Sequence, residues 1–409
     1  MSQDIPQTRS ETRTRKRARI GFLSTHPFQY SAPLYAYLNR TDDIEPVALY
    51  LTDFSLRGAH DRQFGRAIKW DGDLLAGYEH HFVGDDFATA EPYGFLALRA
   101  GNIERHLAAF DLDALVIHGH NHLALLQAML AAHRLRIPML YKGETHLLLP
   151  RSRLKGAVRR PVMSRLFRYF SGFLAVSQRN REFYRAHGVP AGKIFDYPYT
   201  VDNRRFVELS SLSAVDRSEV RAELGLSDAT PVVIYASKFM PRKHPDDLIR
   251  ACAQLRDHGA ECQLLFVGTG EMEHALRALA AQYPALPVTF AGFRNQAELP
   301  RILGASDIFV LPSENEPFGL IINEAMCAGL PIVAAEEIGS VPDLVHQDVN
   351  GRLFDAGDVS GLANALEPIL RDPALRRSMG EASRALMAGW DFERNLRGLR
   401  NMLARLPAP

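Results

Sequence analysis

DIFVLPSENEPFGLIINEAMCAG, residues 307–329, combines a buried strand, an acidic loop and a helix in one short stretch. The apolar run ends near Pro312, and the pattern predicts that a helix begins near Phe318 or Gly319. The N-terminus of a helix presents unpaired N–H groups and the positive end of its dipole, which suits a phosphate. A glycine at this point lets the backbone approach an anion closely. The stretch therefore predicts an anion site beyond the end of a strand.

Two acidic residues flank this predicted helix start. Glu316 precedes the helix and Glu324 lies more than one turn inside it, so that both can border one pocket. A carboxylate accepts two hydroxyl hydrogen bonds, which fits recognition of a ribose or a hexose. The alternative is a solvated acidic loop followed by an ordinary amphipathic helix. The neighbours of Glu324 are apolar, and a carboxylate among them is costly to bury without a partner.

Short apolar runs alternate with amphipathic stretches from Arg19 onward. The predicted strands of the first half are Ile20–Ser24, Val47–Thr52, Ala114–His118, Ile137–Lys142 and Phe173–Ser177, with helices at Pro33–Arg40, Leu123–Arg134 and Asn180–His187. The second half has strands at Val232–Ser237, Gln263–Gly268, Val288–Gly292, Ile308–Pro312 and Ile332–Ala335, with helices at Pro245–Asp257, Glu271–Gln282 and Gly319–Gly329. This alternation implies parallel sheets with both faces covered. We predict an α/β protein with two tandem doubly wound Rossmann-like domains facing across a ligand-binding cleft.

A polar, Ser-rich segment, Val207–Ser227, carries no strand signal and separates the two halves. We therefore place one domain at residues 19–206 and the next at residues 207–388, with a final segment at 389–409. Residues 1–18 are polar and basic near their end, which is typical of a disordered tail.

The overall composition excludes several classes of protein. The 409 residues include 48 basic and 47 acidic side chains, so the chain lacks the broad positive field that non-specific nucleic-acid binding requires. Its three cysteines are too few and too scattered for a disulfide framework or a zinc site. The N-terminus has no apolar signal-peptide core, and no run approaches the ~18 apolar residues of a membrane span. We expect a cytoplasmic protein with reduced thiols.

The spacing of Glu316 and Glu324 resembles the E-x7-E signature of the retaining glycosyltransferases of family 4, which have the two-domain GT-B fold. The resemblance continues through GLPIVAAEEIGSVPDLV (329–345) and NGRLF (350–354) and covers nearly the whole chain beyond residue 18. It implies that Glu324 binds the ribose of a nucleotide-diphosphate sugar and that Glu316 contacts the transferred sugar near the reacting carbon. It also implies that no metal or cofactor is needed and that the donor is a UDP- or GDP-sugar.

The same resemblance assigns further donor-binding residues. In SKFMPRKHPDDLI (237–249), Lys238 falls at the family's arginine position and Lys243 at its lysine. Lysine cannot grip a phosphate in the bidentate way of arginine, but it still offers a point charge to a departing diphosphate. Two surface lysines are the alternative. The remaining donor-side candidates are Gly268 at a strand-end turn, Phe293 at the nucleobase position, Phe318, and the Gly319 and Leu320 amides at the diphosphate.

The first loop departs from the family pattern. STHPFQYSAP (24–33) contains no glycine and is similar to a branch with His-Pro-x-Gln-Tyr at this place, as is WDGDLLAGYEHHF (70–82). His26, Gln29 and Tyr30 are therefore candidates for the acceptor side or the donor side. Structural packing of the loop is the alternative.

Three histidines in VIHGHNH (116–122) lie at the end of the predicted strand Ala114–His118 and just after it. The resemblance implies that His120 approaches the transferred sugar near the reacting carbon. His118 and His122 each lie two residues away from the position of the family's histidine. A metal site is disfavoured because no carboxylate or cysteine accompanies them. In YKGETH (141–146), Glu144 is a candidate contact for acceptor hydroxyls.

The acceptor is expected to be a glycan or a lipid-linked sugar. The stretch Arg151–Arg168 carries seven basic residues and no acid, which fits either peripheral contact with the inner membrane surface or a solvated helix face. A last helix is predicted to start at Trp390-Asp391-Phe392. The resemblance implies that this helix crosses back to the first domain and couples the two domains.

The predicted function is thus a hexosyltransferase of polysaccharide or glycoconjugate biosynthesis, with Glu316 and His120 at the reacting carbon. Two alternatives stay open. One is another enzyme on this fold, such as a sugar-nucleotide epimerase. The other is a non-catalytic sugar-nucleotide-binding subunit of a polysaccharide assembly complex. The intact set of Glu316, Glu324, Lys243 and His120 speaks against the second, whereas the altered first loop and Lys238 favour it.

Overall fold

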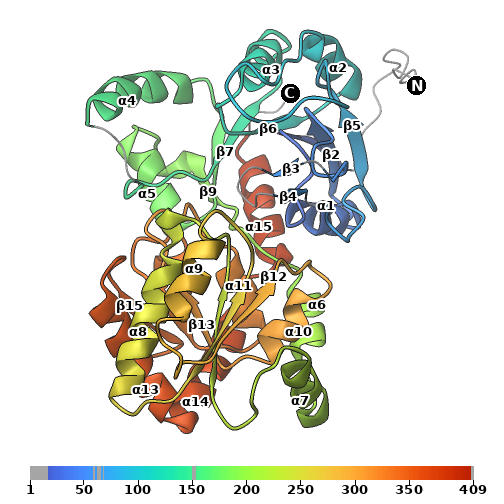
Figure 1. The fold of residues 1–409 in the computed structure, drawn as a ribbon. Helices are drawn as coiled ribbons and strands as arrows, with labels where there is room; N and C mark the ends of the chain where they lie inside the picture. Colours follow the sequence, from blue (N-terminus) through green and yellow to red (C-terminus); the bar gives the residue numbers. More distant parts are fainter. Residues whose placement is uncertain (1–16, 59, 62–65, 68, 150–152, 407–409) are drawn as a thin grey trace.

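The computed structural model describes residues 17–58, 60–61, 66–67, 69–149 and 153–406. The chain forms two α/β lobes, one above the other in Figure 1, each built around a parallel sheet. This is the GT-B arrangement, and it confirms the predicted fold class. Within the described residues, no helix has both the length and the apolar character needed to cross a membrane.

The N-terminal lobe contains a seven-stranded sheet of order β5-β2-β1-β6-β7-β8-β9, with every neighbouring pair parallel. Its strands are β1 (Ala18–Ser24), β2 (Ile44–Tyr50), β5 (Glu79–Phe82), β6 (Ala114–His118), β7 (Met139–Gly143), β8 (Gly172–Ala175) and β9 (Ile194–Asp196). Its helices are α1 (Ser31–Asn39), α2 (Ile103–Phe110), α3 (Leu123–Arg134), α4 (Arg153–Phe167) and α5 (Gln178–Ala186). Two short strands, β3 (His60–Asp61) and β4 (Arg66–Ala67), pair antiparallel beside the sheet.

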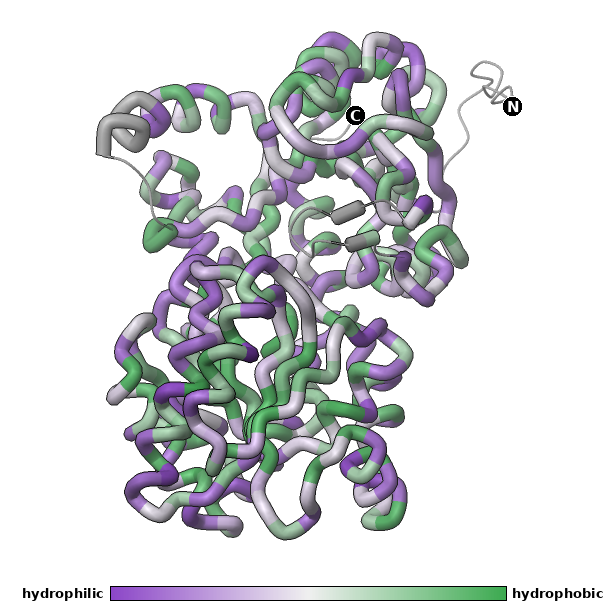
Figure 2. Tube along the Cα trace, viewed as in Figure 1, coloured by the Kyte–Doolittle hydropathy of each residue, from purple (hydrophilic) through white to green (hydrophobic). Residues whose placement is uncertain are grey.

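The C-terminal lobe contains a six-stranded parallel sheet of order β12-β11-β10-β13-β14-β15. The strands are β10 (Val232–Ala236), β11 (Gln263–Val267), β12 (Val288–Gly292), β13 (Ile308–Leu311), β14 (Ile332–Ala335) and β15 (Gly351–Phe354). The helices are α6 (Asn203–Ser210), α7 (Ala214–Glu223), α8 (Pro245–Asp257), α9 (Glu273–Ala280), α10 (Leu299–Gly304), α11 (Ile321–Cys327), α12 (Val341–Leu344), α13 (Val359–Arg371) and α14 (Pro373–Met387). All residues of β10, β11, β13 and β14 are buried, as continuous apolar runs require in a doubly covered sheet. In Figure 2 the hydrophobic colour runs along these central strands.

The last helix, α15 (Phe392–Leu403), packs against β9 and α1 of the N-terminal lobe, although it follows the C-terminal lobe in sequence. Figure 1 shows this red helix against the blue part of the chain. Leu396, Leu399 and Met402 are buried in the same cluster as Ile20 and Phe22 of β1. Burying these side chains makes α15 part of the first lobe's core.

Two crossing segments therefore connect the lobes, one after β9 and one before α15. They are joined to each other, because the indole Nε1 of Trp390 donates to the carbonyl oxygen of Tyr199 at 2.8 Å. The same carbonyl accepts from Nδ2 of Asn323 in α11 at 3.2 Å. Thr200 donates to Asn395 of α15 at 2.8 Å. The crossing point is thus a hydrogen-bonded junction.

The predicted boundary between residues 206 and 207 falls inside α6. Asp202 caps this helix by accepting from the Arg205 amide, and the helix packs against α10 and α11 of the C-terminal lobe. The sequence signal was weak because α6 buries only Phe206 and Ser210. The segment 207–227 contains no strand, as predicted, and holds the end of α6 and the capped helix α7.

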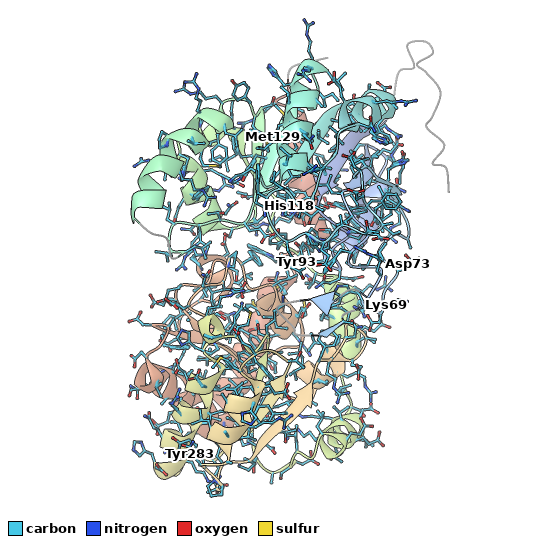
Figure 3. All side chains as sticks on the ribbon, turned by 45° about the horizontal axis from the view of Figure 1, so that its top comes forward. Lys69, Asp73, Tyr93, His118, Met129 and Tyr283 are labelled. Carbon is cyan, nitrogen blue, oxygen red and sulfur yellow. The ribbon has the colours of Figure 1, made fainter. Side chains whose placement is uncertain are left out.

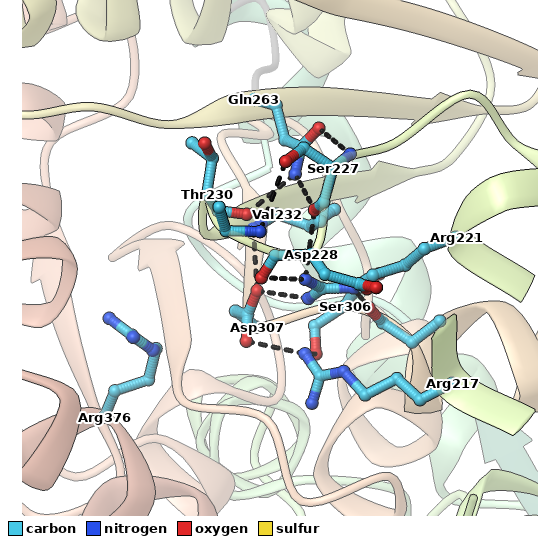
Figure 4. A network of polar contacts seen from close by, with 12 residues as sticks. Arg217, Arg221, Ser227, Asp228, Thr230, Val232, Gln263, Ser306, Asp307 and Arg376 are labelled. Carbon is cyan, nitrogen blue, oxygen red and sulfur yellow. Dashed lines mark hydrogen bonds and ion pairs between the residues drawn. The ribbon is translucent and has the colours of Figure 1, made fainter. Parts of the chain in front are cut away.

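Helix α7 is held by a polar network at the start of β13 (Figure 4). Asp307 pairs with Arg217 at 2.7 Å and with Arg221 at 2.6 Å, and it also accepts from the Val232 amide. Arg221 is almost fully buried, and a buried guanidinium requires such a partner. This network fixes α7 to the amino ends of the strands. The opposite, carboxyl ends of the strands face the first lobe.

Candidate functional site

The carboxyl ends of the strands in the two sheets face each other across the junction. A cavity of about 520 Å³ lies there, lined by the first loop, the turn after β6, the end of β7 and Lys238 of the C-terminal lobe. His118 and Tyr93, which line this cavity, are labelled near the meeting of the lobes in Figure 3. His146 closes part of the interface by donating to the carbonyl oxygen of Glu316 at 3.2 Å.

Lys243 and Glu316 form an ion pair in the C-terminal lobe, in which the lysine is buried and the glutamate half-buried. Lys243 ends the 3-10 turn Pro241–Lys243 that follows β10, and Glu316 lies in the loop that follows β13. Burial and the neighbouring cations Arg242 and Lys238 lower the pKa of the Lys243 ammonium, whereas the Glu316 carboxylate stabilises its charged form. The structure thus brings two predicted site residues into direct contact.

Glu324 lies in the first turn of α11, because the helix begins at Ile321 and not at Phe318 or Gly319. The prediction that it lies more than one turn inside the helix is wrong for the same reason. Its side chain is buried and 3.4 Å from Nε2 of Gln296. Burial raises the pKa of the Glu324 carboxyl to about 7, against smaller opposite effects of Gln296 and Arg205. A raised pKa of this kind is typical of functional sites.

The backbone before α11 is bent by Gly319, whose φ is +88°. A side chain here would be strained, and its Cβ would lie 2.9 Å from Ile338. The Gly319, Leu320 and Ile321 amides therefore occupy a tight turn and first helical turn beside Glu316. Phe318 is buried and its ring is 5.2 Å from that of Tyr199, so its side chain belongs to the crossing point.

The other predicted donor-side residues lie around the same strand ends. Lys238 lines the inter-lobe cavity, and its carbonyl accepts from the Tyr235 hydroxyl at 2.9 Å. Gly268 has a φ of +139°, and a Cβ there would lie 2.1 Å from the carbonyl oxygen of Ser237. Gly268 is thus required for the close approach of two loops. Phe293 follows β12, and its ring is 6.1 Å from Trp70 of the other lobe.

His118 ends β6 and His120 and His122 follow it, and the three histidines have different partners. Nδ1 of His120 is 2.7 Å from the Tyr141 hydroxyl, and its Nε2 accepts from Arg159 at 3.4 Å. Because arginine only donates, the neutral imidazole of His120 carries its proton on Nδ1. His122 bonds to the carbonyl oxygen of Gly94. Among the described residues, no group of His, Cys, Asp and Glu side chains has the arrangement of a metal site.

Glu144 is the centre of a polar cluster at the inner end of the cavity. Nε2 of His118 is 3.2 Å from its carboxylate, and Tyr199 donates a short hydrogen bond to it. Burial raises the pKa of Glu144, but these two bonds and the charge of Lys142 outweigh burial and lower it to about 2. Burial lowers the pKa of Lys142 itself to about 8, and its ammonium lies over the Tyr199 ring at 4.5 Å.

The first loop supplies aromatic side chains to the cavity. His26 lies 4.4 Å from Phe28 and 5.8 Å from Phe54, measured between ring centroids. The Tyr30 ring stacks on Phe28 and contacts Tyr199 edge-on at 4.9 Å, which places it beside the Glu144 cluster. Gln29 is half-buried in the turn that precedes α1.

Several residues at the site were not predicted from the sequence. They are Trp70, Arg159, His146, Tyr199, Arg205 and Gln296. His146 lies in the same YKGETH motif as Glu144, and Arg159 belongs to the basic stretch Arg151–Arg168. Residues 151–152 of that stretch lie outside the described residues. In α4, Met163 and Phe167 are buried and Val162 is exposed.

Comparisons with known proteins agree for both lobes. The family described as Glycosyl transferases group 1 matches residues 216–386, and the family described as Glycosyl transferase 4-like domain matches residues 74–199. Among solved structures, Anabaena Alr3699/HepE in complex with UDP and glucose has a TM-score of 0.69 at 23% identity, covering 95% of this chain and 100% of that one. WaaG, a glycosyltransferase involved in lipopolysaccharide biosynthesis, has a TM-score of 0.63 at 15% identity, covering 94% and 99%.

Curated relatives match in part or over most of the chain. A GDP-mannose-dependent monoacylated alpha-(1-6)-phosphatidylinositol monomannoside mannosyltransferase of Corynebacterium glutamicum is 34% identical over 51% of this chain and 56% of its own length. A D-inositol 3-phosphate glycosyltransferase of Segniliparus rotundus is 27% identical over 93% of this chain and 88% of its own. The match to the Corynebacterium glutamicum protein thus spans only about half of that protein's length. The match to a D-inositol 3-phosphate glycosyltransferase of Nocardia farcinica covers 42% of that protein's length.

Proposed function

We propose that this chain transfers a hexose from a nucleoside diphosphate to an acceptor hydroxyl with retention of configuration, on the premise that residues 216–386 match the family Glycosyl transferases group 1. The observation that carries the proposal is the convergence at one inter-lobe cavity. His120 and Glu144 come from the first lobe, and Lys238 comes from the second. The Lys243–Glu316 pair lies in the loops that follow the neighbouring strands β10 and β13.

Glycosyl transfer develops negative charge on the departing diphosphate and positive charge at the anomeric carbon. Groups that already point at the developing charge stabilise the transition state without reorganising. In the proposal, the ammonium groups of Lys238 and Lys243 and the amides of Gly319 and Leu320 receive the diphosphate. They take the part that a divalent metal plays in other enzymes. Glu316 is then beside the sugar, where its carboxylate supports the cationic carbon.

The nucleoside end of the donor is proposed to lie at Glu324 and Phe293. Glu324 faces Gln296 in a buried setting, and an ionised carboxylate there accepts both hydroxyls of a ribose. The Phe293 ring offers a flat face to the base. Structures of similar fold include one that binds UDP and glucose, which supports a nucleotide-sugar donor.

The acceptor is proposed to occupy the part of the inter-lobe cavity that the first lobe lines. One wall is aromatic, with His26, Phe28, Phe54 and Tyr93, and the Glu144 carboxylate lies in the lining. Apolar surface with a few placed polar groups is the usual composition of a small-molecule site. A sugar ring fits such a wall with its C–H face on the rings and its hydroxyls toward Glu144, which favours a glycan acceptor.

The test begins with the purified full chain and a panel of UDP-, GDP- and ADP-hexoses. A bound donor raises the melting temperature, which identifies the base and the sugar. The chosen donor is then incubated with and without saccharide acceptors, and the anomeric configuration of the product is read by NMR. Transfer with retention supports the proposal. Binding without hydrolysis or transfer overturns it in favour of a non-catalytic subunit, and epimerised donor overturns it in favour of an epimerase.

A further inference from the structure

A short segment of the N-terminal lobe, Lys69–Asp71, reaches the C-terminal lobe and contacts the loop 293–297. Nδ2 of Asn295 donates to the carbonyl oxygen of Lys69 at 2.9 Å. The Ala297 amide donates to the carboxylate of Asp71 at 2.8 Å. We call Lys69–Asp71 the bridge. Figure 3 shows Lys69 and Asp73 where the upper lobe meets the lower one.

The third contact of the bridge is aromatic. The rings of Trp70 and Phe293 are edge-to-face, with centroids 6.1 Å apart and planes at 62°. Aromatic pairs with this geometry attract each other beyond the effect of the area they bury. The bridge thus holds the loop by one ring contact and two hydrogen bonds.

The loop that the bridge holds connects directly to the buried glutamate of the C-terminal lobe. Gln296 lies between the two bridge-bonded residues Asn295 and Ala297, and its Nε2 is 3.4 Å from the Glu324 carboxylate. Its carbonyl accepts from Arg205 at 2.7 Å. A shift of the loop would therefore move both Phe293 and the hydrogen-bond donor of Glu324.

We propose that the bridge is a positioning element of the nucleoside end of the donor site, supplied by the lobe opposite the one that binds the nucleotide. This inference rests on the proposed function. It assigns to Trp70 and Asp71 an effect on nucleoside affinity and base preference that acts through Phe293 and Gln296. The diphosphate end lies at the other strand ends, at Lys238 and Lys243, and is independent of the bridge.

The experiment measures binding of UDP, GDP, ADP and inorganic pyrophosphate to the full chain by calorimetry. The variants are Trp70→Ala and Asp71→Ala, with Asp71→Asn as the conservative change that keeps an acceptor oxygen. Asp73→Ala is the matched control, because its carboxylate accepts only from the nearby Leu75 amide among the contacts described for it. Asp71 and Asp73 are both exposed, so folding is expected to be unaffected, and circular dichroism checks this.

For Trp70→Ala and Asp71→Ala, we expect the Kd of the preferred nucleotide to rise about tenfold, as for the loss of one charge-assisted bond or ring contact. The difference between UDP, GDP and ADP shrinks, and pyrophosphate binding is unchanged. The donor KM rises by a similar factor, whereas kcat stays within about twofold of the value for the unaltered protein. Asp71→Asn and Asp73→Ala bind as the unaltered protein does.

Other outcomes overturn the inference in distinguishable ways. If both alanine variants keep the affinities and base order of the unaltered chain, the bridge has no such role, although the proposed function stands. An equal loss for pyrophosphate and nucleotides shows a general disturbance of the lobe and also refutes the inference. If the unaltered chain binds none of the nucleotides, the proposed function fails and the bridge fails with it.

Discussion

The ammonium group of Lys243 and the carboxylate of Glu316 form an ion pair whose side chains are only 6% and 17% exposed. They follow β10 and β13, which are neighbours at the centre of the sheet although 73 residues separate the pair. The order of the strands along the chain reverses between β10 and β13. Doubly wound sheets bind their ligands at this kind of switch point, beyond the carboxyl ends of the strands. Removing one partner of a buried pair leaves an uncompensated charge, so each member can be tested through the other.

Glu316→Gln is expected to lower the transfer rate by about 10²–10³-fold, the range seen when one transition-state contact is removed. Nucleotide binding stays measurable, because the amide keeps the shape of the carboxylate. Steady-state kinetics with the donor found in the thermal-shift panel measures the rate. Glu314→Gln in the same loop is the control, since the Glu314 side chain is 53% exposed and its one ion-pair partner among the described residues is His244. Full activity of Glu316→Gln removes the proposed mechanism.

The ion pair also predicts a non-additive effect on stability. Lys243→Met leaves the Glu316 carboxylate without its partner, and we expect a loss of about 3–5 kcal/mol in the free energy of unfolding. The double variant with Glu316→Gln removes both charges and recovers most of that loss. Urea unfolding of the two single variants and the double variant closes the cycle. Additive losses contradict a direct charge–charge interaction.

The interior strands of both sheets could be predicted because burial on both faces demands continuous apolar runs. The predicted bounds of the interior strands β6 and β14 agree with the structure, and so do those of the half-buried edge strand β12. Strands β5, β9 and β15 were not predicted, and all three are edge strands. The Glu79–Phe82 strand is only half-buried, and Ile194–Asp196 has three residues, so neither carries a strong apolar pattern.

The candidate site could be predicted only in part, for a related reason. Spacing along the chain placed Glu316, Glu324 and Lys243 at strand ends, but their mutual contacts depend on the order of strands in the sheet. The helix start was predicted two to three residues early, because Gly319 forms a tight turn before α11. The contact of Asn295 with Lys69 spans 226 residues and two lobes, and no local pattern encodes it.

Because the Glu324 carboxyl is buried, we expect the free energy of unfolding of the chain to fall as pH rises. Burial raises the pKa of its carboxyl from the usual 4.5 to about 7 in the folded chain. Between these values the folded state binds more protons than the unfolded state, so stability falls with rising pH, and the full penalty of about 3 kcal/mol is present above pH 7. Glu324→Gln is therefore expected to be more stable than the unaltered chain at pH 8 and equally stable at pH 4. Equal pH profiles of unfolding contradict the raised pKa.

The same carboxyl links nucleotide binding to protons. Ribose hydroxyls donate to an ionised carboxylate, so binding at pH 6–7 is expected to release part of a proton from Glu324. Calorimetry in buffers of different ionisation enthalpy measures this release. Glu324→Gln should bind the nucleotide weakly and without a buffer-dependent enthalpy. Proton uptake, or release that persists in the variant, places the titrating group elsewhere.

Tyr197 and Tyr199 lie on the crossing segment that follows β9. Changing each of them to phenylalanine gives a matched pair of variants that tests the hydrogen bond to Glu144. The Tyr199 hydroxyl donates to Glu144, whereas the buried Tyr197 hydroxyl has no hydrogen-bond partner among the described residues. Tyr199→Phe removes a hydrogen bond to a carboxylate. It keeps the backbone bonds of Tyr199 to Asn323 and Trp390, because these use its carbonyl oxygen. The Glu144 side chain is 39% exposed, so water replaces part of the lost bond, and we expect a loss of about 1 kcal/mol at pH 7.

The pH dependence separates this effect from a packing defect. The pKa of Glu144 is held at about 2 against a usual 4.5, so its stabilisation is present above pH 4.5 and is lost as pH falls toward 2. The deficit of Tyr199→Phe in urea unfolding should therefore shrink on acidification through that window. Tyr197→Phe should be neutral or slightly stabilising at every pH, because it removes an unsatisfied buried hydroxyl. A deficit of equal size in both variants, or one independent of pH, means that the Tyr199–Glu144 bond does not hold the crossing segment to the first lobe.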